Sequence, residues 1–129
     1  MSALCWMVAV GALGLLPSVA GAQAPSPPPG VTAAQVEEGG KIFKGKGICF
    51  SCHGQDAKGV KGLGADLTDR QWIHSKGSYE EIVAQIKKGV PAAESTTKLV
   101  MPPNGGTNLS DAEVRWVAAY VWTLGQGKQ

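Results

Sequence analysis

Apolar side chains recur at helical spacing in three segments of the chain, and each segment opens with a helix-start pattern. In each case a Ser or Thr stands three residues before a Gln or Glu, which is typical of a capping box. The predicted helices begin at Thr32, Ser78 and Ser110 and run to about Gly45, to Gly89 and to Leu124. Their apolar positions are Val36, Phe43, Ile82, Val83, Ile86, Val114, Val117, Val121 and Leu124. No stretch alternates long enough to predict a strand, so the expected fold class is all-α, with Gly-rich loops between the helices.

The first 22 residues have a different pattern, because they carry no charged side chain. Their apolar run, Leu4 to Leu16, is shorter than the about 20 residues that a transmembrane helix needs. It leads to Ala20-Gly21-Ala22, a small-residue cleavage pattern, so we expect residues 1–22 to be a secretory signal peptide cleaved after Ala22. The segment lacks the Lys or Arg that usually begins such a signal, which leaves an uncleaved N-terminal anchor as the alternative.

Proline dominates the next segment, residues 23–31, which contains Pro25, Pro27, Pro28 and Pro29. Such a sequence predicts an extended linker. The folded domain is then expected to cover residues 32–129. A domain of this size has a limited core and often needs a covalent link or a cofactor for stability.

Charge is nearly balanced, with 12 basic and 10 acidic side chains. This small excess gives no reason to expect a nucleic-acid partner. The lysines are nevertheless concentrated between residues 41 and 61, where Asp56 is the single acid. They are Lys41, Lys44, Lys46, Lys58 and Lys61. Such a group is either an ordinary solvated surface or a rim that guides an acidic partner.

Two cysteines remain after removal of the signal, and both lie in Cys49-Phe50-Ser51-Cys52-His53. A redox disulfide of this spacing requires a βαβ context, which the Gly- and Lys-rich flanks do not provide. A structural zinc site requires four ligands, and the processed chain has only two Cys and two His. The remaining reading is attachment of haem, since two cysteines three positions apart can reach both vinyl groups at one porphyrin edge. We therefore expect one covalently bound haem c, with His53 on the iron.

The second axial ligand separates electron transfer from ligand chemistry at haem iron. The processed chain has one methionine, Met101, followed by Pro102 and Pro103. These prolines fix the backbone in an extended loop, so a thioether there is well placed to complete the iron site. His74 is the alternative ligand, which would give a bis-histidine haem.

These residues identify a family resemblance: over residues 32–127 the chain resembles the monohaem class I cytochromes c. The resemblance rests on residues 49–53, on Met101-Pro102, and on Gly39 with Phe43 in the first helix. It implies a cytochrome c fold, in which three main helices and their loops surround one covalently bound haem. It also implies that Gly39 permits a close crossing of the last helix, with Tyr120 on the other side.

Gly64-Ala65-Asp66-Leu67 takes the place of the family's Gly-Pro-x-Leu. The resemblance implies that the carbonyl of Ala65 accepts a hydrogen bond from Nδ1 of His53 and that Leu67 packs on the haem. Ala65 replaces the usual proline, so the loop is less stiff. Residues 67–72, with Gly77-Ser78 and the helix that follows, are similar to haem domains of bacterial haem–copper oxidase subunits. In such domains a tryptophan placed like Trp72 lies near a haem propionate; an ordinary core aromatic is the alternative role for Trp72.

The expected function is electron transfer rather than catalysis, in a bacterial respiratory or related redox chain. The expected location is the periplasm. The expected partners are redox proteins with acidic docking surfaces, and membrane contact would come through them or through an uncleaved anchor. Two alternatives remain open, namely a small haem enzyme or sensor with an open sixth iron site and a module fixed in a larger complex.

Overall fold

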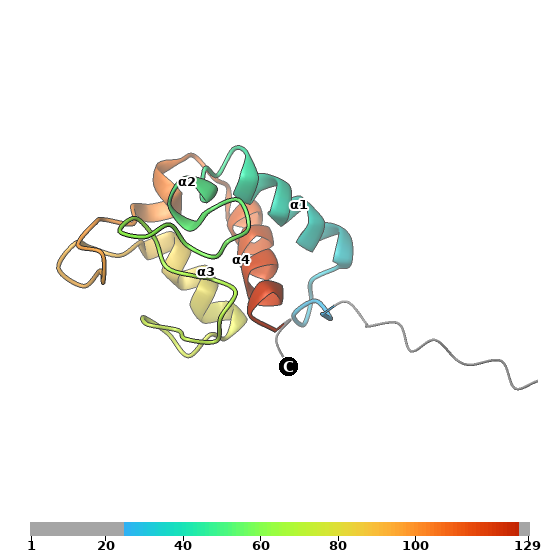
Figure 1. Cartoon of the computed structure of the whole chain (residues 1–129). Coiled ribbons are helices and arrows are strands. Elements are labelled where there is room, and N and C mark those ends of the chain that lie inside the picture. The colour runs from blue at the N-terminus through green and yellow to red at the C-terminus, as the bar shows by residue number, and fades with distance from the viewer. Residues whose placement is uncertain (1–24, 127–129) are drawn as a thin grey trace, which may run out of the picture.

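The computed structural model describes residues 25–126 as a set of helices joined by long loops. The predicted signal peptide, residues 1–22, lies outside the described residues. The elements are α1 (Ala33–Lys44), α2 (Phe50–His53), α3 (Tyr79–Lys88), the 3₁₀ helix η1 (Pro103–Gly106) and α4 (Asp111–Gln126) (Figure 1). Within residues 25–126 the structure has no strand, only two isolated bridges, Val60 to Gly64 and Val90 to Met101. The all-α prediction is confirmed.

The three predicted helix starts are found as capping boxes. In α1 the Thr32 hydroxyl accepts from the Gln35 amide, and the Gln35 side chain accepts from the Thr32 amide. In α3 Ser78 is capped in the same way by Glu81. At the start of α4 the Glu113 carboxylate accepts from the Ser110 amide at 2.8 Å. Each box satisfies amides that the first helical turn leaves without a partner.

Helix α4 lies between α1 and α3 (Figure 1) and contacts both of them. Its crossing with α1 is close because Gly39 has no side chain: a Cβ there would overlap the carbonyl of Trp116 and lie 3.0 Å from the Val117 nitrogen. Beside the crossing, the rings of Phe43 and Tyr120 have centroids 5.5 Å apart. The structure therefore has the close crossing that the family resemblance implies.

Two helices and one helix end differ from the sequence prediction. Helices α2 and η1 span only four residues each, too few to show a periodic apolar pattern. The last helix ends at Gln126, two residues beyond the predicted Leu124. A Cβ at Gly125 would lie 3.1 Å from Cζ2 of Trp72, so this glycine lets the indole pack closely on the end of the helix.

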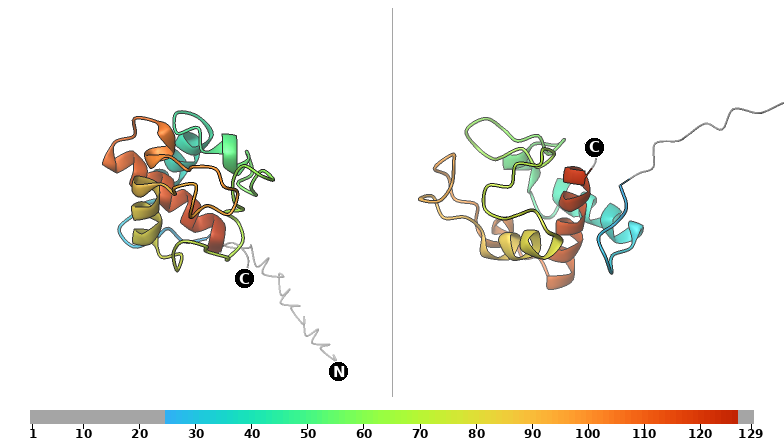
Figure 2. Two further views of the ribbon diagram at one scale, coloured as in Figure 1. Left: turned by 90° about the vertical axis from the view of Figure 1, so that its left-hand side faces the viewer. Right: turned by 90° about the horizontal axis from the view of Figure 1, so that it is seen from below.

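Part of the predicted linker packs on the domain. Pro28 is fully buried, and the Val31 amide donates to its carbonyl across a turn at Gly30, whose φ is 78°. This segment lies on the same side of the molecule as the C-terminal end of α4 (Figures 1 and 2). Throughout residues 25–126, no helix has the length and apolar character needed to span a membrane.

Candidate haem site

A large cavity opens between α2, α3, α4 and the long loops that connect them. Its inner wall is apolar and includes Leu67, Ile82, Ile86, Val117 and Val121. The cavity volume is about 190 Å³. A single water needs roughly 10–15 Å³ of such space together with several polar partners. The cavity therefore suits an apolar organic group far better than a few bridging waters.

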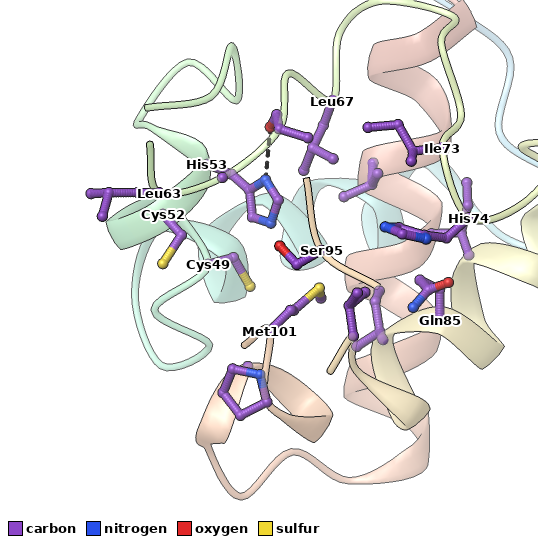
Figure 3. Close-up of a pocket in the computed structure, with 18 of the residues that line it drawn as sticks. Cys49, Cys52, His53, Leu63, Leu67, Ile73, His74, Gln85, Ser95 and Met101 are labelled. Atoms are coloured by element: carbon purple, nitrogen blue, oxygen red, sulfur yellow. Dashed lines mark hydrogen bonds between the residues drawn. The ribbon is translucent and has the colours of Figure 1, made fainter. Parts of the chain in front are cut away.

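Helix α2 places the predicted attachment motif at the edge of this cavity. Cys49 precedes its first residue and His53 is its last, so one helical turn presents both thiols and the imidazole to the same space. In Figure 3 the sulfur atoms of Cys49 and Cys52 lie together at one side of the cavity. Cys49 is half-buried and Cys52 is exposed. Burial raises the pKa of the Cys49 thiol to about 11, so this thiol is protonated at neutral pH.

His53 is oriented by the loop that follows it. Its Nδ1 lies 2.9 Å from the carbonyl oxygen of Ala65, drawn as the dashed line in Figure 3. The loop is fixed at this distance by two backbone bonds, Gly59 N to His53 O and Leu67 N to Ala57 O, both of 2.8 Å. With Nδ1–H donating to Ala65, the other ring nitrogen carries the free lone pair and points into the cavity. Ala65 thus supplies a carbonyl to His53 at the position that the family resemblance implies.

Burial also determines the protonation of this imidazole. It lowers the pKa of His53 because the charged form loses hydration, and the bond to the Ala65 carbonyl opposes this effect only partly. The side chain is then neutral at neutral pH, which is the form that binds a metal ion. Hydrogen bonds of this kind usually fix the orientation of a metal-bound histidine.

Met101 reaches the cavity from the opposite wall (Figure 3). Its backbone is joined to the end of α3 by the bridge with Val90, whose two hydrogen bonds measure 2.8 and 2.9 Å. Pro102 follows in an extended conformation, with φ −69° and ψ 154°, as the sequence predicts. The thioether and the imidazole of His53 therefore face the same space.

The remaining predicted residues also line the cavity. Leu67 and Trp72 are half-buried and pack on the hydrophobic core. Trp72 lies between Gly77 and Gly125, where a Cβ on either glycine would press on the indole. His74, the alternative ligand, is exposed and lines the same cavity. The structure brings all the predicted site residues to one space, together with Gln85 and Asn104, which the sequence reading did not single out.

Unusual backbone conformations flank both sides of the site. Ile48, directly before Cys49, has a φ of 46°, and Asn104, three residues after Met101, has a φ of 52°. Such conformations typically cost about 1–3 kcal/mol and occur where the surrounding structure demands them. The Oδ1 atom of Asn104 is buried and has no hydrogen-bond partner within the described part of the chain.

These features fit a haem c group. The cavity is apolar, one imidazole nitrogen and one thioether enter it from facing walls, and two thiols stand at one edge. Imidazole and methionine sulfur are the ligand pair of electron-transfer cytochromes c. Haem could thus be held by Cys49, Cys52, His53 and Met101.

Three of the five clustered lysines are already paired. Lys41 contacts Glu37 and Glu38, Lys46 contacts Glu113, and Lys58 contacts Asp56. The sequence count missed Glu113 because α4 brings it from a distant part of the chain. Across residues 25–126, Lys44, Lys61 and Lys98 form no ion pair.

Comparison with known proteins agrees with the resemblance to cytochromes c. A family model described as cytochrome c oxidase, cbb3-type, subunit III matches residues 34–121. The cbb3-type cytochrome c oxidase subunit FixP of Sinorhizobium medicae is 36% identical over 107 residues, which cover 82% of this chain and 32% of that protein. The cbb3-type cytochrome c oxidase subunit CcoP of Cereibacter sphaeroides is 34% identical over 99 residues, 74% of this chain and 30% of that protein. The chain thus spans about a third of the length of these relatives. No solved structure matches it. On the evidence of the family model and these relatives, the chain belongs to the cytochrome c oxidase, cbb3-type, subunit III family.

Proposed function

We propose that the chain is an electron-transfer protein that carries one electron on a single haem c. Cys49 and Cys52 would form the two thioether links, and His53 and Met101 would bind the iron. One observation carries the proposal: the His53 imidazole and the Met101 thioether enter one apolar cavity from opposite walls. Met101 is what separates electron transfer from the rival, a haem enzyme or sensor, because it leaves no open iron position.

Haem supplies an iron atom that alternates between the ferrous and ferric states. The protein keeps both ligands in place during this change, since His53 is tied to Ala65 and the backbone of Met101 is tied to Val90. A ligand set that moves little keeps the reorganisation energy low. The apolar wall of the cavity excludes water and, together with the thioether, favours the less charged ferrous state. Trp72 lines the cavity, and the family resemblance suggests that it would lie near a haem propionate and donate its indole N–H there.

A patch of exposed apolar side chains at the cavity mouth is the proposed docking surface. Leu63, Leu99 and Val100 are exposed by 42, 45 and 58%. Lys61 stands two residues before Leu63 and Lys98 directly precedes Leu99, and neither lysine forms an ion pair within residues 25–126. The Thr97 hydroxyl connects the two loops by donating to the Leu63 carbonyl. This arrangement suits redox partners with an acidic surface, which the lysines would guide on approach. Lys98 therefore joins Lys61 as a steering residue, whereas Lys46 is held by Glu113.

We propose a bacterial respiratory chain as the setting of this function, and the relatives named as cbb3-type oxidase subunits support this proposal. We propose a periplasmic location, after export directed by residues 1–22. Membrane contact would come through partners or through residues 1–22 if they are retained. The protein would act as a free carrier or as one part of an oxidase complex, and size-exclusion chromatography of the native protein from its source distinguishes the two.

The test is a redox titration of the haem-containing protein combined with carbon monoxide binding. We expect a reversible one-electron transition and slow or no carbon monoxide binding to the reduced protein at neutral pH. Rapid carbon monoxide binding would favour the enzyme or sensor with an open sixth position. The intact mass of the native protein would report the number of attached haems and the removal of residues 1–22.

A further inference from the structure

The backbone of Met101 is attached to the C-terminal end of α3, and to little else among the described residues. The bridge consists of Val90 N to Met101 O at 2.8 Å and Met101 N to Val90 O at 2.9 Å. Val90 comes two residues after the last residue of α3. The position of the thioether in the cavity therefore depends on how firmly this helix end holds Gly89 and Val90.

Gln85 makes two hydrogen bonds to that helix end, one through its backbone and one through its side chain. Its backbone carbonyl accepts from the Gly89 amide at 2.8 Å, which closes the last helical turn. Its side-chain Nε2 donates to the Gly89 carbonyl at 2.7 Å. This carbonyl is one of those that a helix end leaves without an intrahelical donor. Gln85 thus fixes both polar groups of Gly89, and it does so from the wall of the cavity (Figure 3).

Gly89 in turn lies directly against the loop that carries Met101. A Cβ at this position would overlap the Met101 carbonyl oxygen and lie 2.8 Å from the Pro103 nitrogen and 2.9 Å from the Pro102 carbonyl carbon. Its φ of 70° is one that other residues seldom adopt. The close approach leaves no room for Gly89 to shift without moving Met101.

We propose that Gln85 is a positioning residue for Met101, acting through Gly89 and Val90 to keep the thioether on the iron. The inference rests on the proposed ligation by Met101. Release of the thioether then requires the last turn of α3 to loosen, so the strength of the Gln85–Gly89 bond sets how often Met101 leaves. The prolines after Met101 limit the shape of the loop, whereas both backbone hydrogen bonds of Met101 itself run to Val90.

The test measures how fast imidazole replaces Met101 on the oxidised protein. The signal is loss of the weak far-red absorption band that marks methionine ligation in oxidised cytochromes c. Gln85→Leu keeps the size of the side chain and removes the donor. Loss of the net stabilisation that one such hydrogen bond provides should raise the rate of Met101 replacement roughly 3–10-fold. Gln85→Asn, whose amide is one methylene too short to reach the Gly89 carbonyl, should give an increase in the same direction while keeping the polarity of the cavity wall.

Gln35→Leu is the matched control. It makes the same substitution and also removes one bond between a side chain and a helix-end backbone group, Thr32 N to Gln35 Oε1 at 2.9 Å. Gln35 belongs to α1 and does not line the cavity. We expect both Leu variants to lower thermal stability, and only the Gln85 variants to accelerate replacement of Met101.

The outcomes separate this inference from the proposed function. If the native oxidised protein has no far-red band, ligation by Met101 is wrong and the inference falls with it. If the band is present but both Gln85 variants exchange at the rate of the native protein or of Gln35→Leu, the positioning role alone is overturned. Gln85→Asn decides the question if Gln85→Leu does not fold.

Discussion

Replacement of Gly39 by alanine tests how tightly the α1–α4 crossing must pack to form one side of the haem site. The added Cβ would overlap the carbonyl of Trp116 and approach the Val117 nitrogen to 3.0 Å. All these atoms belong to the α4 backbone, so no side chain can rotate away. The two helices would have to separate, and Phe43 and Val117, each 1% exposed, would lose contacts.

The expected magnitude combines two opposing effects. Alanine favours a helix over glycine by about 1 kcal/mol. Overpacking a close contact costs typically about 1–3 kcal/mol, and backbone atoms that cannot move aside put this case at the upper end. The net loss is then about 2 kcal/mol in the free energy of unfolding, or a fall of roughly 8–16 °C in the melting temperature of a domain of this size.

Thermal unfolding of the haem-containing protein is the assay, with Gly40→Ala as the matched control. The atoms nearest to a Cβ on Gly40 all belong to the Tyr120 ring, the closest at 3.1 Å. This side chain can shift, and the cost of the shift offsets the gain in helix propensity of about 1 kcal/mol. We therefore expect a change near zero for Gly40→Ala. A Gly39→Ala protein that melts at or above the native temperature would refute the close-packing explanation of Gly39.

Three further predictions concern the attachment of haem, acid stability and docking. Cys52→Ala should leave at most one thioether link, so haem staining on a denaturing gel should weaken, and full staining would show that Cys52 forms no link. The pair with Lys46 and the bonds from Ser110 lower the pKa of Glu113 to about 2 from about 4.5. A lowered pKa in the folded state means that Glu113 stabilises the fold above pH 4.5 and that this contribution disappears as the pH falls towards 2. Chemical unfolding at a series of pH values should therefore show a steeper acid loss for the native protein than for Glu113→Gln, and identical slopes would contradict the assignment. Charge reversal of Lys61 and Lys98 to Glu should slow association with an acidic redox partner and weaken its dependence on ionic strength, whereas the same change at the paired Lys58 should have less effect. An association rate that does not respond to salt in the native protein would exclude steering.

The helices were predictable from the sequence because their signals are local. A Ser or Thr three residues before Gln or Glu fixes where α1, α3 and α4 begin, and apolar spacing fixes the face that each one buries. The close packing of Trp72 on Gly125 could not be predicted, because these two residues lie far apart in the sequence. The burial of Pro28 could not be predicted for the same reason, since composition alone does not show that a Pro-rich segment meets the surface of a folded domain.

The candidate site also has parts that the local sequence predicts and parts that depend on contacts between distant segments. The motif at Cys49, Cys52 and His53 is contiguous, so its spacing alone predicts the attached group. The attachment of Met101 to Val90 and the bond from Gln85 to Gly89 join segments whose pairing no local pattern encodes. The lysine count overestimated the free positive charge because tertiary structure brings Glu113 to Lys46.

The far-red absorption band of the oxidised protein tests the central claim most directly, because it reports the bond between Met101 and the iron. The account predicts that the native protein shows this band at neutral pH and that Met101→Ala loses it while the haem stays attached. It also predicts a lower redox potential for that variant, since loss of the thioether removes a ligand that favours ferrous iron. A native protein without the band, or a Met101→Ala variant that retains it, would contradict the assignment of Met101 and with it the case for a closed electron-transfer site.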